Sequence, residues 1–234
     1  MRAWAKRILP LLRRREGLLL GVALLLLLFF DHTSPAFLQP QNLLGMTRHI
    51  AEIGIMSLGM TMVLLTAGID LSVGSMLGLS AAVLGRVWQE SHSLPLAILS
   101  ALGVGLLAGA GNGWLVAQVG MPPLIVTLAT LAIYRGLALG LLKAHSVHDF
   151  PEGFFWLGQG LIGKGDWGLP TQLVLWFFLA IWGHLALSHT SFGRGLYAIG
   201  GNEEAARLSG LPVGKLKVLA YTLSGLGAAV AALV

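Results

Sequence analysis

Residues 95–119 read PLAILSALGVGLLAGAGNGWLVAQV, and this stretch decides the fold class. It carries no charged side chain and exceeds the roughly 20 apolar residues that a helix needs to cross a bilayer. Ala101, Gly105, Gly109 and Gly113 recur every four residues along it and therefore share one helix face. Such faces let helix backbones approach closely where lipid supplies no hydrophobic drive between helices. We predict a membrane-spanning helix that packs through this face.

The composition of the whole chain agrees with this interpretation. Of the 234 residues, 56% are hydrophobic and 11% are charged, with a mean hydropathy of +0.79, whereas soluble domains carry roughly 25% charged residues. Long unbroken apolar runs exclude a β-barrel, whose strands alternate. We predict an all-α polytopic membrane protein, a bundle of about seven transmembrane helices. The helices are expected at residues 17–30, 50–67, 71–88, 95–119, 124–142, 169–187 and from 218 onward.

Both ends of the chain affect this count. The run at 17–30 is followed by Phe-Phe-Asp-His, which lacks a small-residue cleavage site, so an uncleaved first span is favoured over a signal peptide. The last apolar run reaches Val234 without a polar or aromatic anchor. We therefore expect this last helix to be truncated and the C-terminal part of the protein to be missing. Residues 17–234 are interpreted as one transmembrane domain.

The basic residues lie in two groups, which together explain a formal charge of +5. One group occupies the N-terminal segment 1–16, and the other consists of Arg194, Arg207, Lys215 and Lys217. Cations concentrate in cytoplasmic loops, so the distribution places the N-terminus inside and, after six crossings, residues 188–217 inside as well. The same distribution of cations accounts for the basic charge of the chain without a nucleic-acid ligand. The absence of cysteine excludes disulfides and thiol chemistry.

The stretch GGNEEAARLSGLP at residues 200–212, called here the polar segment, interrupts the apolar runs. Asn202 is a suitable N-cap, two acids follow at the positive helix end, and Gly210 with Pro212 ends the helix. A helix resting on lipid is the alternative, but two acids near an anionic leaflet oppose it. We predict a site for a soluble cytoplasmic partner. Its candidate residues are Gly201, Asn202, Glu203, Glu204, Ala205, Ala206 and Gly210.

Glycines of the third predicted span give a second small-residue face. Gly74, Gly78 and Ala82 are spaced by four residues. We predict a packing face here too, while the alternative is that glycine is simply common in membrane helices.

Ionisable residues within spans are costly and are functional candidates by default. Asp70 lies beside Ser72 in a broken stretch between two spans, where it either lines a pathway or caps the following helix. Arg135, next to Tyr134, is expected to pair with a buried acid or contact a helix break rather than reach the membrane surface. Further pathway candidates, for which interhelical hydrogen bonds are the alternative, are Asn112, Thr127 and Thr130.

Enzyme motifs for metalloproteases, P-loops, dinucleotide folds and nucleophile elbows are absent from the sequence. The cluster His145, His148, Asp149 and Glu152 is interpreted as a solvated loop surface rather than a metal site. The chain is therefore predicted to be neither an enzyme nor a cofactor-binding protein.

Three stretches resemble the ABC importer permeases. Glu204-Ala205-Ala206 followed by Gly210 is similar to their EAA loop, with residues 191–194 upstream extending the match. The stretches LTAGIDLSVGS at 65–75 and PPLIVTLAT at 122–130, continuing to Tyr-Arg-Gly at 134–136, resemble the monosaccharide branch of ribose, xylose, galactose, rhamnose and autoinducer-2 permeases.

This resemblance implies a multi-pass permease of the bacterial inner membrane with about ten spans in a longer chain. It implies a second permease copy or paralogue, a periplasmic sugar-binding protein, and a cytoplasmic ATPase subunit that holds ATP and Mg²⁺ and docks on a coupling loop at 194–214. The implied function is ATP-driven import of a monosaccharide or related polyol. The alternative is an ion-coupled secondary transporter or channel for a small polar solute, with a central role for Asp70 or Arg135.

Overall fold

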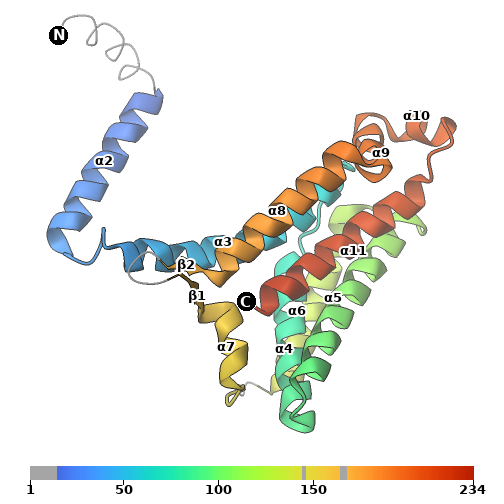
Figure 1. The fold of residues 1–234 in the computed structure, drawn as a ribbon. Coiled ribbons are helices and arrows are strands. Elements are labelled where there is room, and N and C mark those ends of the chain that lie inside the picture. Colours follow the sequence, from blue (N-terminus) through green and yellow to red (C-terminus); the bar gives the residue numbers. More distant parts are fainter. Residues whose placement is uncertain (1–14, 144–145, 164–167) are drawn as a thin grey trace, which may run out of the picture. The chain divides into compact units, whose positions relative to one another are not determined.

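The computed structural model describes residues 15–143, 146–163 and 168–234, and it is almost entirely helical, as predicted (Figure 1). Arg2, Lys6, Arg7, Arg13, Arg14 and His145 therefore lie outside the described residues. The helices are α2 (Arg15–Thr33), α3 (Pro40–Leu64), α4 (Val73–Ser91), α5 (Leu94–Ala117), α6 (Pro123–Leu142), α7 (Glu152–Gln159), α8 (Thr171–His189), α9 (Ser191–Gly201), α10 (Glu203–Leu208) and α11 (Val213–Ala232). Two short strands, β1 (Leu161–Ile162) and β2 (Leu169–Pro170), pair antiparallel.

The chain divides into two compact units. One unit comprises Met1–Met46 with Lys164–Trp167, and the other comprises Thr47–Gly163 with Gly168–Val234. In the first unit, the leucines and phenylalanines of α2 are exposed on all sides of the helix. A helix that is apolar all round needs lipid or protein around it, which agrees with the predicted first span.

Three described helices, α5, α6 and α8, are long and apolar enough to cross a membrane. The helices α3, α4 and α11 match predicted spans but include more polar residues. The helix that contains the second predicted span begins earlier than residue 50, since α3 is already helical from Pro40, and the start of the span itself stays a prediction. Pro40 is tolerated there because the first turn of a helix has no use for its missing N–H.

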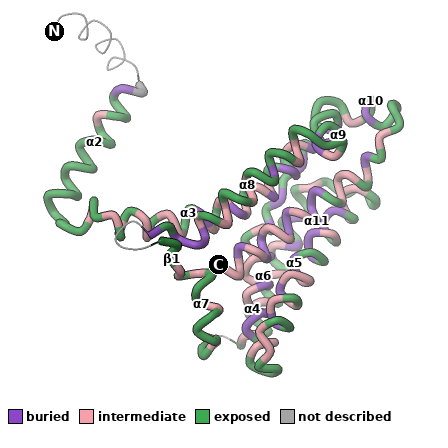
Figure 2. Tube along the Cα trace, viewed as in Figure 1, coloured by how far each residue is buried: buried purple, intermediate pink, exposed green. Residues whose placement is uncertain are grey.

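In the second unit, α11 runs along α5, and α4 packs against α5, α6 and α11 (Figure 1). Buried residues gather along these contacts (Figure 2). The helices approach so closely because glycines face each other. A methyl group added to Gly113 would lie 2.8 Å from the Cα of Val218, and one added to Gly109 would collide with the carbonyl oxygen of Tyr221. Gly105 meets Gly225 and Ala229 in the same way.

The second glycine face has a different environment. A methyl group added to Gly74 or Gly78 would have no atom within 4 Å. Both residues line an open groove between α4 and α6. A packing role for these two glycines stays a prediction.

Candidate functional site

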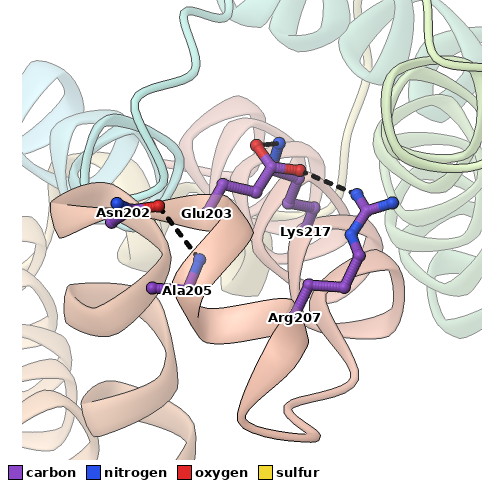
Figure 3. Close-up of polar contacts among 5 residues, drawn as sticks. All are labelled: Asn202, Glu203, Ala205, Arg207 and Lys217. Carbon is purple, nitrogen blue, oxygen red and sulfur yellow. Dashed lines mark hydrogen bonds and ion pairs between the residues drawn. The ribbon is translucent and has the colours of Figure 1, made fainter.

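The polar segment folds locally as its sequence suggests. Helix α9 ends at Gly201, Asn202 is extended, and its side-chain oxygen accepts a hydrogen bond of 3.0 Å from the backbone N–H of Ala205 (Figure 3). The six-residue α10 then ends before Gly210, whose φ of +83° favours glycine. The segment is therefore a short capped helix held between two tight turns.

Two cations hold Glu203 in place (Figure 3). Its carboxylate accepts a hydrogen bond of 2.6 Å from Lys217 Nζ, at the start of α11, and one of 3.2 Å from the Arg207 guanidinium. The hydrogen bond from Lys217 is the main reason that the pKa of Glu203 lies below its ordinary value. Lys217 is only 14% exposed, so this pair fastens α10 to α11.

The two alanines of the segment face opposite ways. Ala206 is 4% exposed and packs with Ile199 and Val213, whereas Ala205 is exposed. Ala206 therefore closes α10 against α9 and α11 and does not lie on the outer face, so a direct role for it in docking stays a prediction. The outer face presents Glu204, Ala205 and Leu208.

Leu208 was missed by sequence reasoning. Its side chain is 83% exposed, the highest value among the large hydrophobic residues described. A single exposed leucine is common on protein surfaces and is not by itself evidence of a partner, but it adds apolar area to the face that carries Glu204 and Ala205. Lys217 was also missed as part of the site, since it follows Glu203 by 14 residues in the chain.

A second polar site surrounds Asp70, in the connection between α3 and α4. Asp70 is fully buried, and its Oδ1 accepts hydrogen bonds from the backbone N–H of Ser72 at 3.0 Å and from Ser72 Oγ at 2.6 Å. Its Oδ2 accepts a hydrogen bond of 3.1 Å from Ser224 Oγ in α11. Hydroxyl and backbone donors thus satisfy the carboxyl group, and no cation pairs with it among the described residues.

The network continues into α5 and α6. Asn112 Nδ2 donates to Ser72 Oγ at 2.8 Å, and Tyr134 Oη donates to Asn112 Oδ1 and to the carbonyl oxygen of Ala108, both at 3.1 Å. One connected set of hydrogen bonds therefore joins the α3–α4 connection to three helices. Asp70 binds the backbone N–H of Ser72, but Ser72 itself is the N-cap of α4 and makes no side-chain cap bond. Both the capping role and the pathway role of Asp70 stay predictions.

The two threonine candidates mainly bond their own helix. Thr127 Oγ1 donates to the carbonyl oxygen of Pro123 at 2.9 Å, and Thr130 Oγ1 to that of Val126 at 3.0 Å. Both are buried. A pathway role for them stays a prediction.

Arg135 is exposed and lines the groove between α4 and α6. The groove has a volume of about 660 Å³, and Ser75 and Ser146 add hydroxyl groups to it. Within residues 15–143, 146–163 and 168–234, Arg135 has no ion pair. The expected buried acid partner is absent there, since hydroxyls and a backbone amide satisfy Asp70. The same residues hold no cluster of three His, Asp or Glu side chains able to bind a metal.

The apolar helices and the exposed polar segment together define a multi-pass membrane protein. Residues 42–234 match the family described as branched-chain amino acid transport system / permease component, and the chain belongs to this family. The resemblance to importer permeases is thereby confirmed, and the chain is the non-catalytic membrane component of a transport system.

Relatives of known name agree with this assignment. The chain is 37% identical over 221 residues to the ribose import permease protein RbsC of Bacillus subtilis (strain 168), covering 93% of this chain and 67% of the relative. It is 32% identical over 276 residues to the xylose transport system permease protein XylH of Escherichia coli (strain K12), covering 92% and 70%. It is 36% identical over 225 residues to the autoinducer 2 import system permease protein LsrD of Klebsiella pneumoniae, covering 94% and 67%. No solved structure matches the chain significantly.

Proposed function

We propose that this chain is the permease subunit of a binding-protein-dependent ABC importer that carries a monosaccharide or a related small polyol across the bacterial inner membrane. The polar segment carries the proposal, because a rigid, outward-facing helix with Glu204, Ala205 and Leu208 exposed is suited to a soluble partner. The names of the relatives support the sugar, since they include ribose and xylose permeases.

The partner in this proposal is a cytoplasmic ATPase subunit, which holds ATP and Mg²⁺ and docks on the polar segment. Docking places the N-terminus and the polar segment on the cytoplasmic side, in agreement with the positions of the basic residues. A periplasmic sugar-binding protein delivers the solute, and a second permease copy or paralogue completes the pathway. The groove with Arg135 contributes to that pathway, because a guanidinium and two hydroxyls suit a polyol.

Uptake by membrane vesicles that contain the native complex tests the proposal. The vesicles are loaded with ATP, and the labelled probes are D-ribose, D-xylose and L-leucine, the last because of the family description. We expect ATP-dependent uptake of one of the sugars. Glu204→Arg should abolish it while the permease still inserts, and Glu152→Arg, the same change on the exposed α7, should leave it unchanged.

Two results would overturn parts of the proposal. Uptake of L-leucine alone would replace the sugar with an amino acid. Uptake that follows an imposed proton or sodium gradient, without nucleotide and unaffected by Glu204→Arg, would support the ion-coupled transporter instead. One observation favours the ion-coupled transporter: Asp70 is buried, and no cation pairs with it within the described chain.

A further inference from the structure

The connection between α3 and α4, residues 65–72, touches both the polar segment and the helices of the proposed pathway. We propose that this connection transmits movement of the polar segment to α5 and α6, and that Asp70 is the positioning residue that fastens it to them. The inference rests on the proposed function, in which a partner ATPase moves the polar segment.

The first contact lies at the end of α9. A methyl group added to Gly200 would collide with the carbonyl oxygen of Leu65 and would lie 4.0 Å from the amide nitrogen of Ala67. The backbones of α9 and the connection therefore touch directly, three residues before α10 begins. Any displacement of α10 toward the membrane presses on this point, since no flexible side chain lies between the two backbones.

The connection is itself a rigid turn. The backbone N–H groups of Thr66 and Gly68 both donate to the carbonyl oxygen of Val63, at 2.9 and 3.2 Å. The Thr66 hydroxyl donates to the same oxygen at 2.8 Å, and Ala67 has a φ of +57°. These bonds fix the backbone from the end of α3 onward. A displacement of Leu65 therefore moves the following residues together, without a local change in the backbone conformation of the turn.

The far end of the connection is fastened to three helices. Asp70 binds Ser224 of α11, and Ser72 receives the hydrogen bond from Asn112 of α5, which in turn binds Tyr134 of α6. Longer contacts of 3.4 Å join the carbonyl oxygen of Ile69 to the hydroxyls of Tyr221 and Thr127. Asp70 holds Ser72 in this network through two hydrogen bonds and binds Ser224 directly, so removing its carboxyl group weakens the attachment of the connection to α11 and, through Ser72, to α5.

A second route leads from the polar segment to the same place. Lys217, bound to Glu203 at 2.6 Å, is followed at i+4 by Tyr221 and at i+7 by Ser224. Residues at this spacing share one helix face, so a single face of α11 carries the bond to α10 and both bonds to the connection. The polar segment thus reaches Asp70 through Gly200 and through α11.

Coupling between ATP hydrolysis and uptake tests the inference in proteoliposomes that hold the native complex. The measured quantity is the number of ATP molecules hydrolysed per sugar molecule taken up, with whichever of D-ribose and D-xylose the wild type transports. We expect Gly200→Ala and Asp70→Asn to keep hydrolysis within twofold of wild type and to raise this ratio about tenfold, as the loss of a typical coupling free energy would. Gly103→Ala is the matched control, because a methyl group there has no atom within 4 Å.

Asp70→Asn retains only one of the two acceptor oxygens and is open to a folding defect. Ser224→Ala, which removes a single donor at the edge of the network, is the second variant and should raise the ratio in the same direction. The inference is overturned if these variants leave the ratio at the wild-type value, or if hydrolysis and uptake fall in proportion. Failure of the proposed function is distinguishable, since the wild-type complex itself would then show no nucleotide-driven uptake.

Discussion

Replacing Gly109 by alanine should destabilise the contact between α5 and α11 more than any other single methyl group added to α5. The added Cβ would collide with the carbonyl oxygen of Tyr221 and lie 3.1 Å from the Cα and the N of Gly225. These are backbone atoms of the opposing helix, so no side chain can rotate away, and one helix must move. Such movement also loosens the neighbouring contacts at Gly105 and Gly113.

The magnitude follows from a matched control on the same helix. Adding a methyl group to a well-packed interior costs about 1–3 kcal/mol, and a backbone collision places Gly109→Ala at the upper end. Gly111→Ala meets nothing within 4 Å. Both variants gain the same helix propensity, about 1 kcal/mol for alanine over glycine. The difference between them therefore isolates the collision, and we expect it to be about 2–3 kcal/mol.

The assay is reversible unfolding of the purified protein in mixed micelles, followed through tryptophan fluorescence. Gly111→Ala should unfold at or slightly above the denaturant concentration of the wild type, and Gly109→Ala clearly below it. Gly225→Ala, which would collide with the carbonyl oxygen of Gly105 from the other helix, should behave like Gly109→Ala. Equal stability of Gly109→Ala and Gly111→Ala would refute close backbone packing between these helices.

Three further outcomes are expected at the polar segment. Because Lys217 holds the pKa of Glu203 below its ordinary value, the wild type should be more stable than Glu203→Gln at neutral pH. This difference in stability should shrink as the pH falls below the pKa of Glu203 in the unfolded chain, and it should vanish below the pKa in the folded protein. Unfolding curves recorded from pH 7 downward measure it. Its size should stay within about 1 kcal/mol, since the Glu203 side chain is 41% exposed. Asn202→Ala should cost about 1 kcal/mol of local stability, seen as faster amide hydrogen exchange at Ala205, and Asn202→Asp should restore the cap. Leu208→Ser should change the unfolding midpoint by no more than about 0.5 kcal/mol yet weaken capture of the co-purifying ATPase, and full capture would remove Leu208 from the docking face.

Local features of this protein were predictable, and partners across the chain were not. The cap of α10 depends on residues within one turn, so the sequence was sufficient to place Asn202. The four-residue glycine spacing identifies a helix face but not what covers it. The face with Gly105 packs against α11, whereas the face with Gly74 lines an open groove.

The ionisable residues show the same limit. Arg135 and Asp70 are both costly inside a membrane, and Arg135 was expected to pair with a buried acid or to contact a helix break. The structure instead satisfies Asp70 through Ser72 and Ser224, the second of which is 154 residues away in the chain. The sequence does not show that a distant serine such as Ser224 binds Asp70, because a serine in a helix can equally bond its own backbone.

A second helix that could carry movement from the polar segment is α8, which ends one residue before α9 and packs against it. Helix α8 also packs against α7 and β2, and its Trp176 lies against Gly54 of α3, whereas α5 packs against α11, α4 and α6. Movement of α9 that travelled through α8 would therefore reach α7 and α3 first. The backbone contact at Gly200 offers a shorter path, because the connection it touches leads within five residues to Asp70 and its hydrogen bonds to the bundle. The contact at Gly200 therefore gives the polar segment a route to α5 and α6 that does not pass through α8.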